Sequence, residues 1–282
     1  MKPILEVKGL RKELGTFRLQ DLHFSLLEGC ITGFIGVNGA GKTTTIKLLL
    51  GLMNKDAGEI AFRGENIDKN EREFKNRIGV VLDDGCFYDD LTLLQMKNIV
   101  APAYSNWDDT LFHDYMKRFD LPVQQKIGTL SKGMRMKYAI ALALSHHADL
   151  LIMDEPTSGL DPQVRLELMD ILLDYVRDGN SVFLSSHITS DLDKVADVLV
   201  LIDDGHIVFS EEKDLLLDSH GLVKGDKQEL NEFTRSLFVS LHETGYGFSG
   251  LTADKAAVRE QMKNVLIERP TVEDILVSYI RR

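Results

Sequence analysis

The residues with the clearest chemical meaning form a glycine-rich run that matches G-x-x-x-x-G-K-[S/T]. This pattern is typical of loops that hold the phosphates of nucleoside triphosphates. The run, with Thr44 directly behind it, consists of Gly36, Val37, Asn38, Gly39, Ala40, Gly41, Lys42 and Thr43. Backbone N–H groups in such a loop form an anion-binding concavity, and a following helix adds the positive end of its dipole. We therefore expect Lys42 to reach the β- and γ-phosphates and the Thr43 hydroxyl to ligate Mg²⁺.

Two carboxylates follow a second buried-strand pattern. The apolar run 150–153 ends in Asp154 and Glu155. Ligands of open α/β sheets bind at the carboxyl ends of the strands, which predicts both side chains beside the phosphate loop. Asp154 is expected to hold Mg²⁺, largely through a water, and Glu155 to orient and deprotonate the attacking water in phosphoryl transfer. An acidic turn without chemistry is the alternative, and the upstream phosphate loop disfavours it.

A histidine ends the next apolar run. His187 follows residues 181–186, at the same predicted edge of the sheet. A lone histidine there is more often structural, but this position also allows a hydrogen bond to a γ-phosphate.

The surrounding patterns predict the elements that position these residues. The apolar run 30–35 precedes the phosphate loop, and apolar residues at helical spacing follow it. Strand patterns return at 150–153 and 181–184, with a helix opened by Asp161 and Pro162 between them. This order predicts a parallel sheet with helical crossovers. Residues 1 to about 30 alternate as antiparallel strands do.

Composition excludes several classes of protein. The 282 residues carry 33 Lys and Arg against 44 Asp and Glu, a formal charge of −11, so we expect no nucleic-acid partner. Cys30 and Cys86 are too far apart for a C-x-x-C metal motif, and burial in a reducing compartment is the simplest expectation. The N-terminus lacks the pattern of a signal peptide. No run approaches the roughly 18 consecutive apolar residues of a membrane span.

Taken in order, these motifs resemble those of the ATP-binding cassette (ABC) ATPase family over roughly residues 4–215. The run 130–134, Leu-Ser-Lys-Gly-Met, stands where the family has its signature, and the run 156–161, Pro-Thr-Ser-Gly-Leu-Asp, resembles the loop after the catalytic glutamate. His187 matches the family's switch histidine. The resemblance implies an α/β fold of the P-loop NTPase type. Its RecA-like parallel core sheet is accompanied by an antiparallel β subdomain, a helical signature subdomain at about 84–145 and a small C-terminal α+β extension at 216–282, the cassette itself spanning 1–215.

The resemblance also implies roles and partners. Glu155, His187 and Lys42 become catalytic residues of a Mg²⁺-dependent ATPase with ATP as substrate. The signature residues become a second phosphate site that acts on ATP held by another subunit: Ser131, Lys132, Gly133 and Met134. A helix expected to begin near Met134 gives this site its N–H groups and dipole. The implied partners are a second cassette, identical or different, and integral membrane permeases, which would hold the chain on the cytoplasmic face of the membrane.

The sequence departs from the family pattern in three places. In the signature, Lys132 and Met134 replace the usual residues but leave the serine and the second glycine intact, so binding of the other subunit's nucleotide is expected to survive. Asp83 stands where the family has a glutamine that touches Mg²⁺ and water; a carboxylate can still ligate Mg²⁺, and a plain turn is an equal alternative. The adenine-stacking aromatic expected near Leu14 is missing. Phe17 is the nearest replacement, at even odds with core packing.

Two questions stay open from the sequence. Phe233, Leu237, Phe238 and Leu241 form either an interaction stripe or, as we favour, part of a core. The resemblance is greatest to bacterial exporter-type ATPases that pair with separate permeases. The rivals are a cassette acting on a ribosome, nucleic acid or assembly complex, and a GTPase switch, whose N-K-x-D motif is missing.

Overall fold

The computed structural model describes residues 2–82 and 87–280. Its centre is a six-stranded sheet with the order β10-β9-β3-β8-β7-β6. The five strands from β9 to β6 are parallel, and β10 pairs antiparallel with β9 at the edge. The bounds are β3 (Ile31–Ile35), β6 (Ile78–Leu82), β7 (Leu150–Asp154), β8 (Ser181–Ser186), β9 (Val198–Asp203) and β10 (His206–Glu212). Strands β3, β7 and β8 are buried along their whole length, as expected of a parallel sheet covered on both faces.

A second, antiparallel sheet covers one face of the central sheet. Its order is β2-β1-β4-β5, with β1 (Pro3–Leu14), β2 (Phe17–Leu27), β4 (Ala57–Phe62) and β5 (Glu65–Asn66). Phe24 of β2 lies 5.8 Å from Phe34 of β3 and 5.9 Å from Phe183 of β8, measured between ring centroids. These three rings join the two sheets in one apolar core, which also includes residues of helix α1 (Lys42–Leu49).

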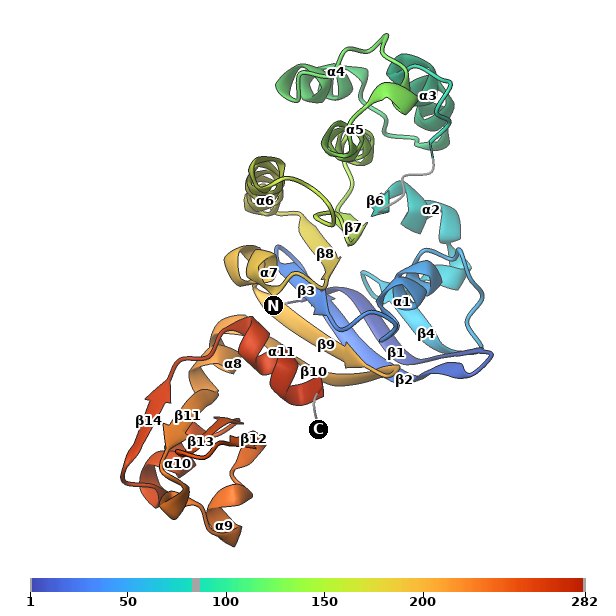
Figure 1. Cartoon of the computed structure of the whole chain (residues 1–282). Coiled ribbons are helices and arrows are strands. Elements are labelled where there is room, and N and C mark those ends of the chain that lie inside the picture. Colours follow the sequence, from blue (N-terminus) through green and yellow to red (C-terminus); the bar gives the residue numbers. More distant parts are fainter. Residues whose placement is uncertain (1, 83–86, 281–282) are drawn as a thin grey trace.

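Helices form the remaining layers of the cassette. Helices α6 (Pro162–Arg177) and α7 (Thr189–Val195) contribute to the core on the other face of the central sheet, and α2 (Glu71–Asn76) precedes β6. A helical part, α3 (Leu93–Val100), α4 (Asp109–Arg118) and α5 (Lys132–Leu144), lies at one end of the molecule (Figure 1). Asp161 caps α6 through a side-chain oxygen, as the sequence predicts, and Asp108 caps α4 in the same way. Within the described residues no helix is long and apolar enough to cross a membrane.

The C-terminal part is a smaller α+β unit, which we call the C-terminal module (residues 221–268). Its strands run in the order β12-β13-β11-β14, all pairs antiparallel. The elements are β11 (Gly221–Gly225), α9 (Glu232–Arg235), β12 (Phe238–Glu243), β13 (Phe248–Thr252), α10 (Lys255–Gln261) and β14 (Val265–Glu268). This βαββαβ order is that of a ferredoxin-like fold.

Two helices flank the module and attach it to the cassette. Helix α8 (Lys213–Ser219) leads into it, so the expected division at residues 215 and 216 falls inside a helix. Helix α11 (Val272–Ile280) follows it and contacts α7, β12 and β13. Val272, Ile275 and Leu276 of α11 share the cassette's core cluster with Leu251 of β13. The module's sheet is therefore joined to the cassette through one apolar layer.

The open question about the extension is settled largely in favour of packing. Leu237, Phe238 and Leu241 pack against the module's own core of Val223, Phe248, Val258 and Met262. Phe233 does not, since 59% of it is exposed. Cys30 is buried, as expected, and Cys86 lies outside the described residues.

Candidate nucleotide-binding and catalytic site

The carboxyl edge of the central sheet forms a cavity of about 580 Å³ that gathers nine of the predicted site residues. They come from segments far apart in the sequence: β2, the loop between β3 and α1 with the first turn of α1, the residues after β7 and the residue after β8. The cavity is lined by Phe17, Asn38, Gly39, Gly41, Lys42, Thr43, Thr44, Glu155, Ser158 and His187. The sequence singled out each of these except Ser158. Parallel strands that end at one edge bring the segments together, as the strand patterns predicted.

The phosphate loop has the backbone that its glycines permit. Gly41 has a φ of 116° and precedes the first residue of α1. A side chain there would come within 2.6 Å of Leu19, and one at Gly36 within 2.4 Å of the Ile202 carbonyl oxygen. Gly41 needs a positive φ, and Gly36 packs too closely against Ile202 for a side chain, so only glycine fits either position. Helix α1 then begins directly at Lys42, with its N-terminus at the cavity.

Lys42 lies across the loop. It is only 6% exposed, and its Nζ donates to the Gly36 carbonyl oxygen at 2.8 Å. The same Nζ forms an ion pair with Glu155 Oε1 at 3.2 Å. A buried ammonium group needs such partners. The cation is thus held between the phosphate loop and the carboxylate, where it can neutralise the charge of a transferring phosphoryl group.

Glu155 sits in an unusual backbone conformation. Its φ of 50° is in the left-handed region, which costs a residue with a Cβ of the order of 1 kcal/mol or more. Ser185 of β8 supports it: the Glu155 N–H donates to the Ser185 hydroxyl at 3.0 Å and to the Ser185 carbonyl oxygen at 3.2 Å. The Ser185 hydroxyl in turn donates to Asp154 Oδ1 at 2.6 Å. One serine thus fixes both carboxylate residues.

His187 holds the other oxygen of Glu155. Its Nδ1 lies 2.6 Å from Glu155 Oε2, and its backbone N–H donates to the same oxygen at 3.2 Å. Because an ionised carboxylate accepts only, Nδ1 carries the proton in this contact. Glu155 is therefore held on one side by Lys42 and on the other by His187. A carboxylate fixed in this way can accept a proton from a water aligned with a γ-phosphate.

Oxygen donors suited to Mg²⁺ are present. The exposed Thr43 lines the cavity, while Asp154 is 7% exposed and is not among the residues that line it. Hydroxyl and carboxylate oxygens are the ligands that Mg²⁺ takes, together with waters and substrate phosphates. These residues fit the ion, which would supply a positive charge on the phosphate oxygens. Asp83, the third expected ligand, lies outside the described residues.

The signature residues do not line this cavity. Ser131 caps α5, its hydroxyl accepting from the Met134 N–H at 3.2 Å. The helix begins at Lys132, two residues earlier than predicted, because the Ser131 side chain satisfies the free N–H of the first turn. Gly133 lies in that turn, where an added Cβ would be 3.2 Å from Val164 of α6. Lys132 lies against Gly159. The role of these four residues toward a second subunit remains a proposal.

Sequence reasoning missed two residues of the site, Ser158 and Ser185. For Phe17 it left open a role in the site or in the core, and the structure shows both. Phe17 lines the cavity while also packing against the apolar core. Ser158 lies in the loop 156–161, which sequence reasoning recognised without selecting the residue. Ser185 had a signal as well, since hydroxyl residues end an otherwise apolar strand at 181–186.

Comparisons with known proteins point to one family. Residues 19–158 match the family described as "ABC transporter". The chain is 35% identical over 212 residues to the bacitracin transport ATP-binding protein BcrA of Bacillus licheniformis, covering 74% of this chain and 69% of that protein. It is 30% identical over 222 residues to the lantibiotic transport ATP-binding protein SrtF of Streptococcus pyogenes, covering 75% and 92%. A solved ATP-binding subunit of an ABC transporter superposes with a TM-score of 0.70 at 27% identity, covering 76% of this chain and 92% of that one.

Proposed function

Since this chain belongs to the ABC transporter family of ATP-binding, ATP-hydrolysing subunits, we propose that it powers transport through separate membrane permeases by closing with a second cassette over bound ATP. The observation that carries the proposal is the cavity at the sheet edge, where Lys42, Glu155 and His187 converge with the phosphate loop. Phosphoryl transfer needs little from a protein beyond this positioning and neutralisation of charge.

A second subunit is proposed because the signature lies away from the cavity. Ser131 and Gly133 stand at the exposed start of α5, a helix of 13 residues whose dipole favours an anion. None of the signature residues lines the cavity of its own chain. Two chains arranged head to tail would let each signature complete the γ-phosphate site of the other.

Size-exclusion chromatography tests the dimer. Glu155→Gln retains the shape of the side chain and removes the base, so bound ATP should persist and hold two chains together. We expect this variant to elute as a dimer with Mg²⁺ and ATP and as a monomer with ADP. Adding Ser131→Arg, which places a bulky cation at the start of α5, should abolish the dimer. A Glu155→Gln chain that stays monomeric with ATP rules out the homodimer and leaves a different partner ATPase.

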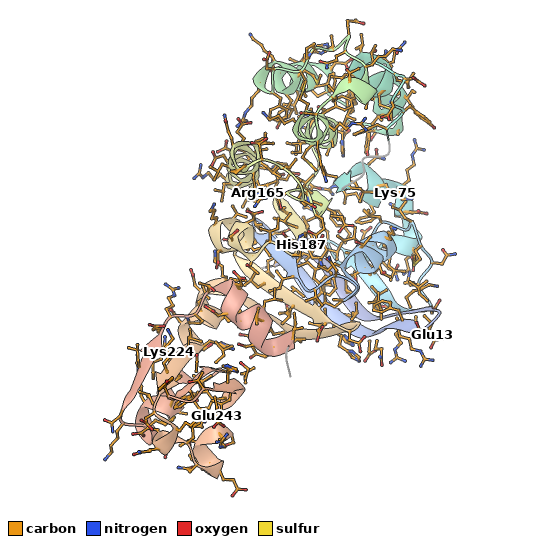
Figure 2. All side chains as sticks on the ribbon, in the orientation of Figure 1. Glu13, Lys75, Arg165, His187, Lys224 and Glu243 are labelled. Carbon is orange, nitrogen blue, oxygen red and sulfur yellow. The ribbon has the colours of Figure 1, made fainter. Side chains whose placement is uncertain are left out.

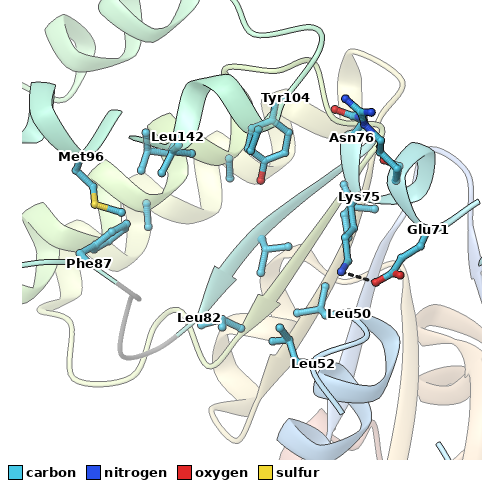
Figure 3. Close-up of a pocket in the computed structure, with 17 residues that line it drawn as sticks. Leu50, Leu52, Glu71, Lys75, Asn76, Leu82, Phe87, Met96, Tyr104 and Leu142 are labelled. Carbon is cyan, nitrogen blue, oxygen red and sulfur yellow. Dashed lines mark hydrogen bonds and ion pairs between the residues drawn. The ribbon is translucent and has the colours of Figure 1, made fainter. Parts of the chain in front are cut away.

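The permease partner is proposed to contact an apolar groove between the central sheet and the helical part (Figure 3). The cavity has a volume of about 700 Å³, and aliphatic and aromatic side chains dominate its lining. Glu71 and Lys75 of α2 form an ion pair at its edge, and Leu52 is 62% exposed. This combination suits a short amphipathic segment at the cytoplasmic surface of a membrane protein, with its apolar side in the groove.

Co-purification from detergent-solubilised membranes tests this contact. Leu52→Asp places a charge at the groove and should lower recovery of the bound membrane protein at least tenfold with ATP hydrolysis retained. Leu215→Asp is the matched control, because Leu215 is also 62% exposed but lies on α8. Recovery of a ribosome or nucleic acid in place of a membrane protein would support the rival class of non-transport cassettes.

We further propose that the cargo leaves the cell. The relatives named above serve bacitracin and lantibiotic transport, and a Nod factor export ATP-binding protein of Ralstonia nicotianae is 35% identical over 213 residues, covering 65% of that protein. Loss of the chain from its host should then raise sensitivity to, or retention of, the exported compound. Through the permease, the chain would sit on the cytoplasmic face of the membrane.

A further inference from the structure

Arg165 bridges the two segments that carry the catalytic residues. It stands in the first turn of α6, just after the loop 156–161. Its Nη2 lies 3.5 Å from the Leu160 carbonyl oxygen in that loop, and its Nη1 lies 3.8 Å from Asp191 Oδ1 on α7. Figure 2 labels Arg165, which lies on α6, and His187, which directly follows β8. The guanidinium thus lies between the segment after Glu155 and the segment after His187.

The pair is partly buried and incompletely satisfied, with 27% of the Arg165 side chain exposed. The Asp191 side chain is 2% exposed. Within the described residues, Asp191 Oδ2 and Arg165 Nε are buried and have no hydrogen-bond partner. Leaving charged groups unpaired in a protein interior is costly, so such atoms call for an explanation. A role only in stability would favour tight, complete pairing, whereas both contacts of this guanidinium are long.

Short chains of contacts connect both ends of the bridge to the catalytic centre. On α7, the Asp191 N–H donates to the Ile188 carbonyl oxygen at 3.2 Å. Ile188 directly follows His187, and its own N–H donates to the Ser186 hydroxyl at 2.9 Å. Asp191 is thus linked through Ile188 to the residue whose ring contacts Glu155 Oε2. On the loop side, Leu160 is two residues from Ser158, which lines the cavity.

We infer that Arg165 is a positioning residue for ATP hydrolysis, which sets His187 against Glu155 by tying the loop 156–161 to α7 through Asp191. When the loop 156–161 moves, a closer contact between Arg165 and Asp191 pulls α7 toward the loop. His187, which precedes α7, is thereby set in hydrogen-bonding position against the Glu155 carboxylate. Arginine suits the position, because its planar fork contacts a carbonyl and a carboxylate at once, which the point charge of lysine does not. The inference rests on the ATP hydrolysis proposed above and extends it to a residue outside the nucleotide cavity.

Steady-state hydrolysis by the full chain tests the inference. Arg165→Ala and Asp191→Asn should each lower kcat about tenfold and leave KM for ATP within twofold, since neither residue lines the cavity. The double variant should fall no further than the worse single variant, because both act through one contact. Arg165→Lys, which retains the charge but loses the fork, should recover part of the loss. Arg177→Ala is the matched control: it lies on the same helix, pairs with Asp174 at 3.2 Å and is 75% exposed.

Thermal unfolding of every variant separates positioning from stability. We expect the kcat loss to persist at temperatures where all variants remain fully folded. Unchanged kcat in Arg165→Ala, losses that multiply in the double variant, or a loss that follows only the folded fraction would each overturn the inference. A wild-type chain unable to hydrolyse ATP would overturn the proposed function and this inference with it, whereas an active wild type with unaffected variants overturns the inference alone.

Discussion

The central sheet and the sheet of the C-terminal module are built from the same kinds of element but differ in strand direction and in the polar groups that they bury. Both combine strands with helices, yet only the central sheet has buried charged groups at or next to its edge: Lys42, Asp154 and, on α7, Asp191. Its middle strands are parallel and buried on both faces, so their carboxyl ends meet and converge on one cavity. The module's strands are all antiparallel, and its buried polar residues are neutral or histidine: Thr234, Thr252 and, at its start, His220.

This difference explains where chemistry lies in the chain. A parallel sheet aligns its strand ends, while an antiparallel sheet distributes them to both edges. The comparison therefore predicts that damage to the sheet edge removes activity without unfolding the chain. Substitutions in the core of the module should destabilise the module and leave the activity nearly unchanged.

The largest effect is expected from the charged groups at the edge. Lys42→Ala removes the cation that contacts the Gly36 carbonyl oxygen and Glu155, and Glu155→Gln removes the carboxylate that we propose as the base. Each should lower kcat at least about 100-fold, of the order of 3 kcal/mol or more in barrier height. Phosphate release by the purified chain measures this. Lys47→Ala is the control, being exposed on the same helix, and a similar loss in that variant would contradict the assignment.

Met262→Ala tests the opposite half of the comparison. Met262 is 2% exposed in the module's own small core, and truncating it should destabilise that core by about 2–5 kcal/mol. Hydrogen exchange across residues 221–268 should rise while kcat of the cassette stays within twofold. A large loss of kcat would show that the module supports the catalytic edge directly.

Leu251→Ala separates attachment from the fold of the module. Leu251 belongs to β13 but lies in the core cluster that includes α11 and α7. The substitution should destabilise this shared core by about 2–4 kcal/mol. Amide hydrogen exchange should therefore increase in both α11 and the module. Equal protection of α11 in Leu251→Ala and Met262→Ala would show that the two clusters act as one.

A smaller effect is expected at Phe17, where site and core meet. Base–aromatic stacking contributes roughly 1–3 kcal/mol per base and accepts any base. Phe17→Leu keeps the apolar contact and should weaken ATP and GTP binding several-fold and to a similar extent, as fluorescence titration would detect. Strong selectivity for one nucleotide in the wild-type chain would contradict stacking as the main contact.

The sequence predicted the parts of the site that depend on local pattern. The glycines of the loop 36–43 determine its backbone geometry locally. Asp154 and Glu155 come at the end of a buried parallel-strand pattern, and the carboxyl ends of such strands lie at one edge of the sheet. Asp161 was identified at the start of a helix because a cap needs only its own first turn, and its side chain indeed accepts from the Gln163 and Val164 N–H groups.

What the sequence could not predict depends on contacts between distant segments. Ser185 supports Glu155 only because β7 and β8 pair with Asp154 opposite Ser185. Arg165 and Asp191 are ordinary charged residues in helical patterns until α6 and α7 meet. The packing of the extension was similarly open, since Phe233 and Leu237 have the same apolar character but differ in what the fold places beside them.

The smallest predicted effect concerns pH at the junction of the two regions. Burial is the main cause that lowers the pKa of His220, opposed by its contact with the Leu216 carbonyl oxygen and by Glu211. Its Nδ1 faces Leu216 and Ser219, and its Nε2 lies 2.9 Å from the Tyr279 hydroxyl of α11. Because the unfolded chain takes up a proton near pH 6.5 and the folded chain only at lower pH, the stability that neutral His220 contributes is complete above about pH 6.5 and lost as pH falls below it.

His220→Gln keeps a polar group toward Tyr279 and cannot titrate. Between pH 7.5 and 5.5 the thermal midpoint should therefore fall less in this variant than in wild type. Burial lowers the pKa of His146 in the cassette too, so part of the wild-type slope should persist in His220→Gln and diminish further when His146→Gln is added. Hydrogen exchange of α11 at the two pH values locates the effect. We expect α11 to lose protection at low pH in wild type but not in His220→Gln, which would assign the pH dependence to the junction. The same loss in both chains would place the titrating group elsewhere.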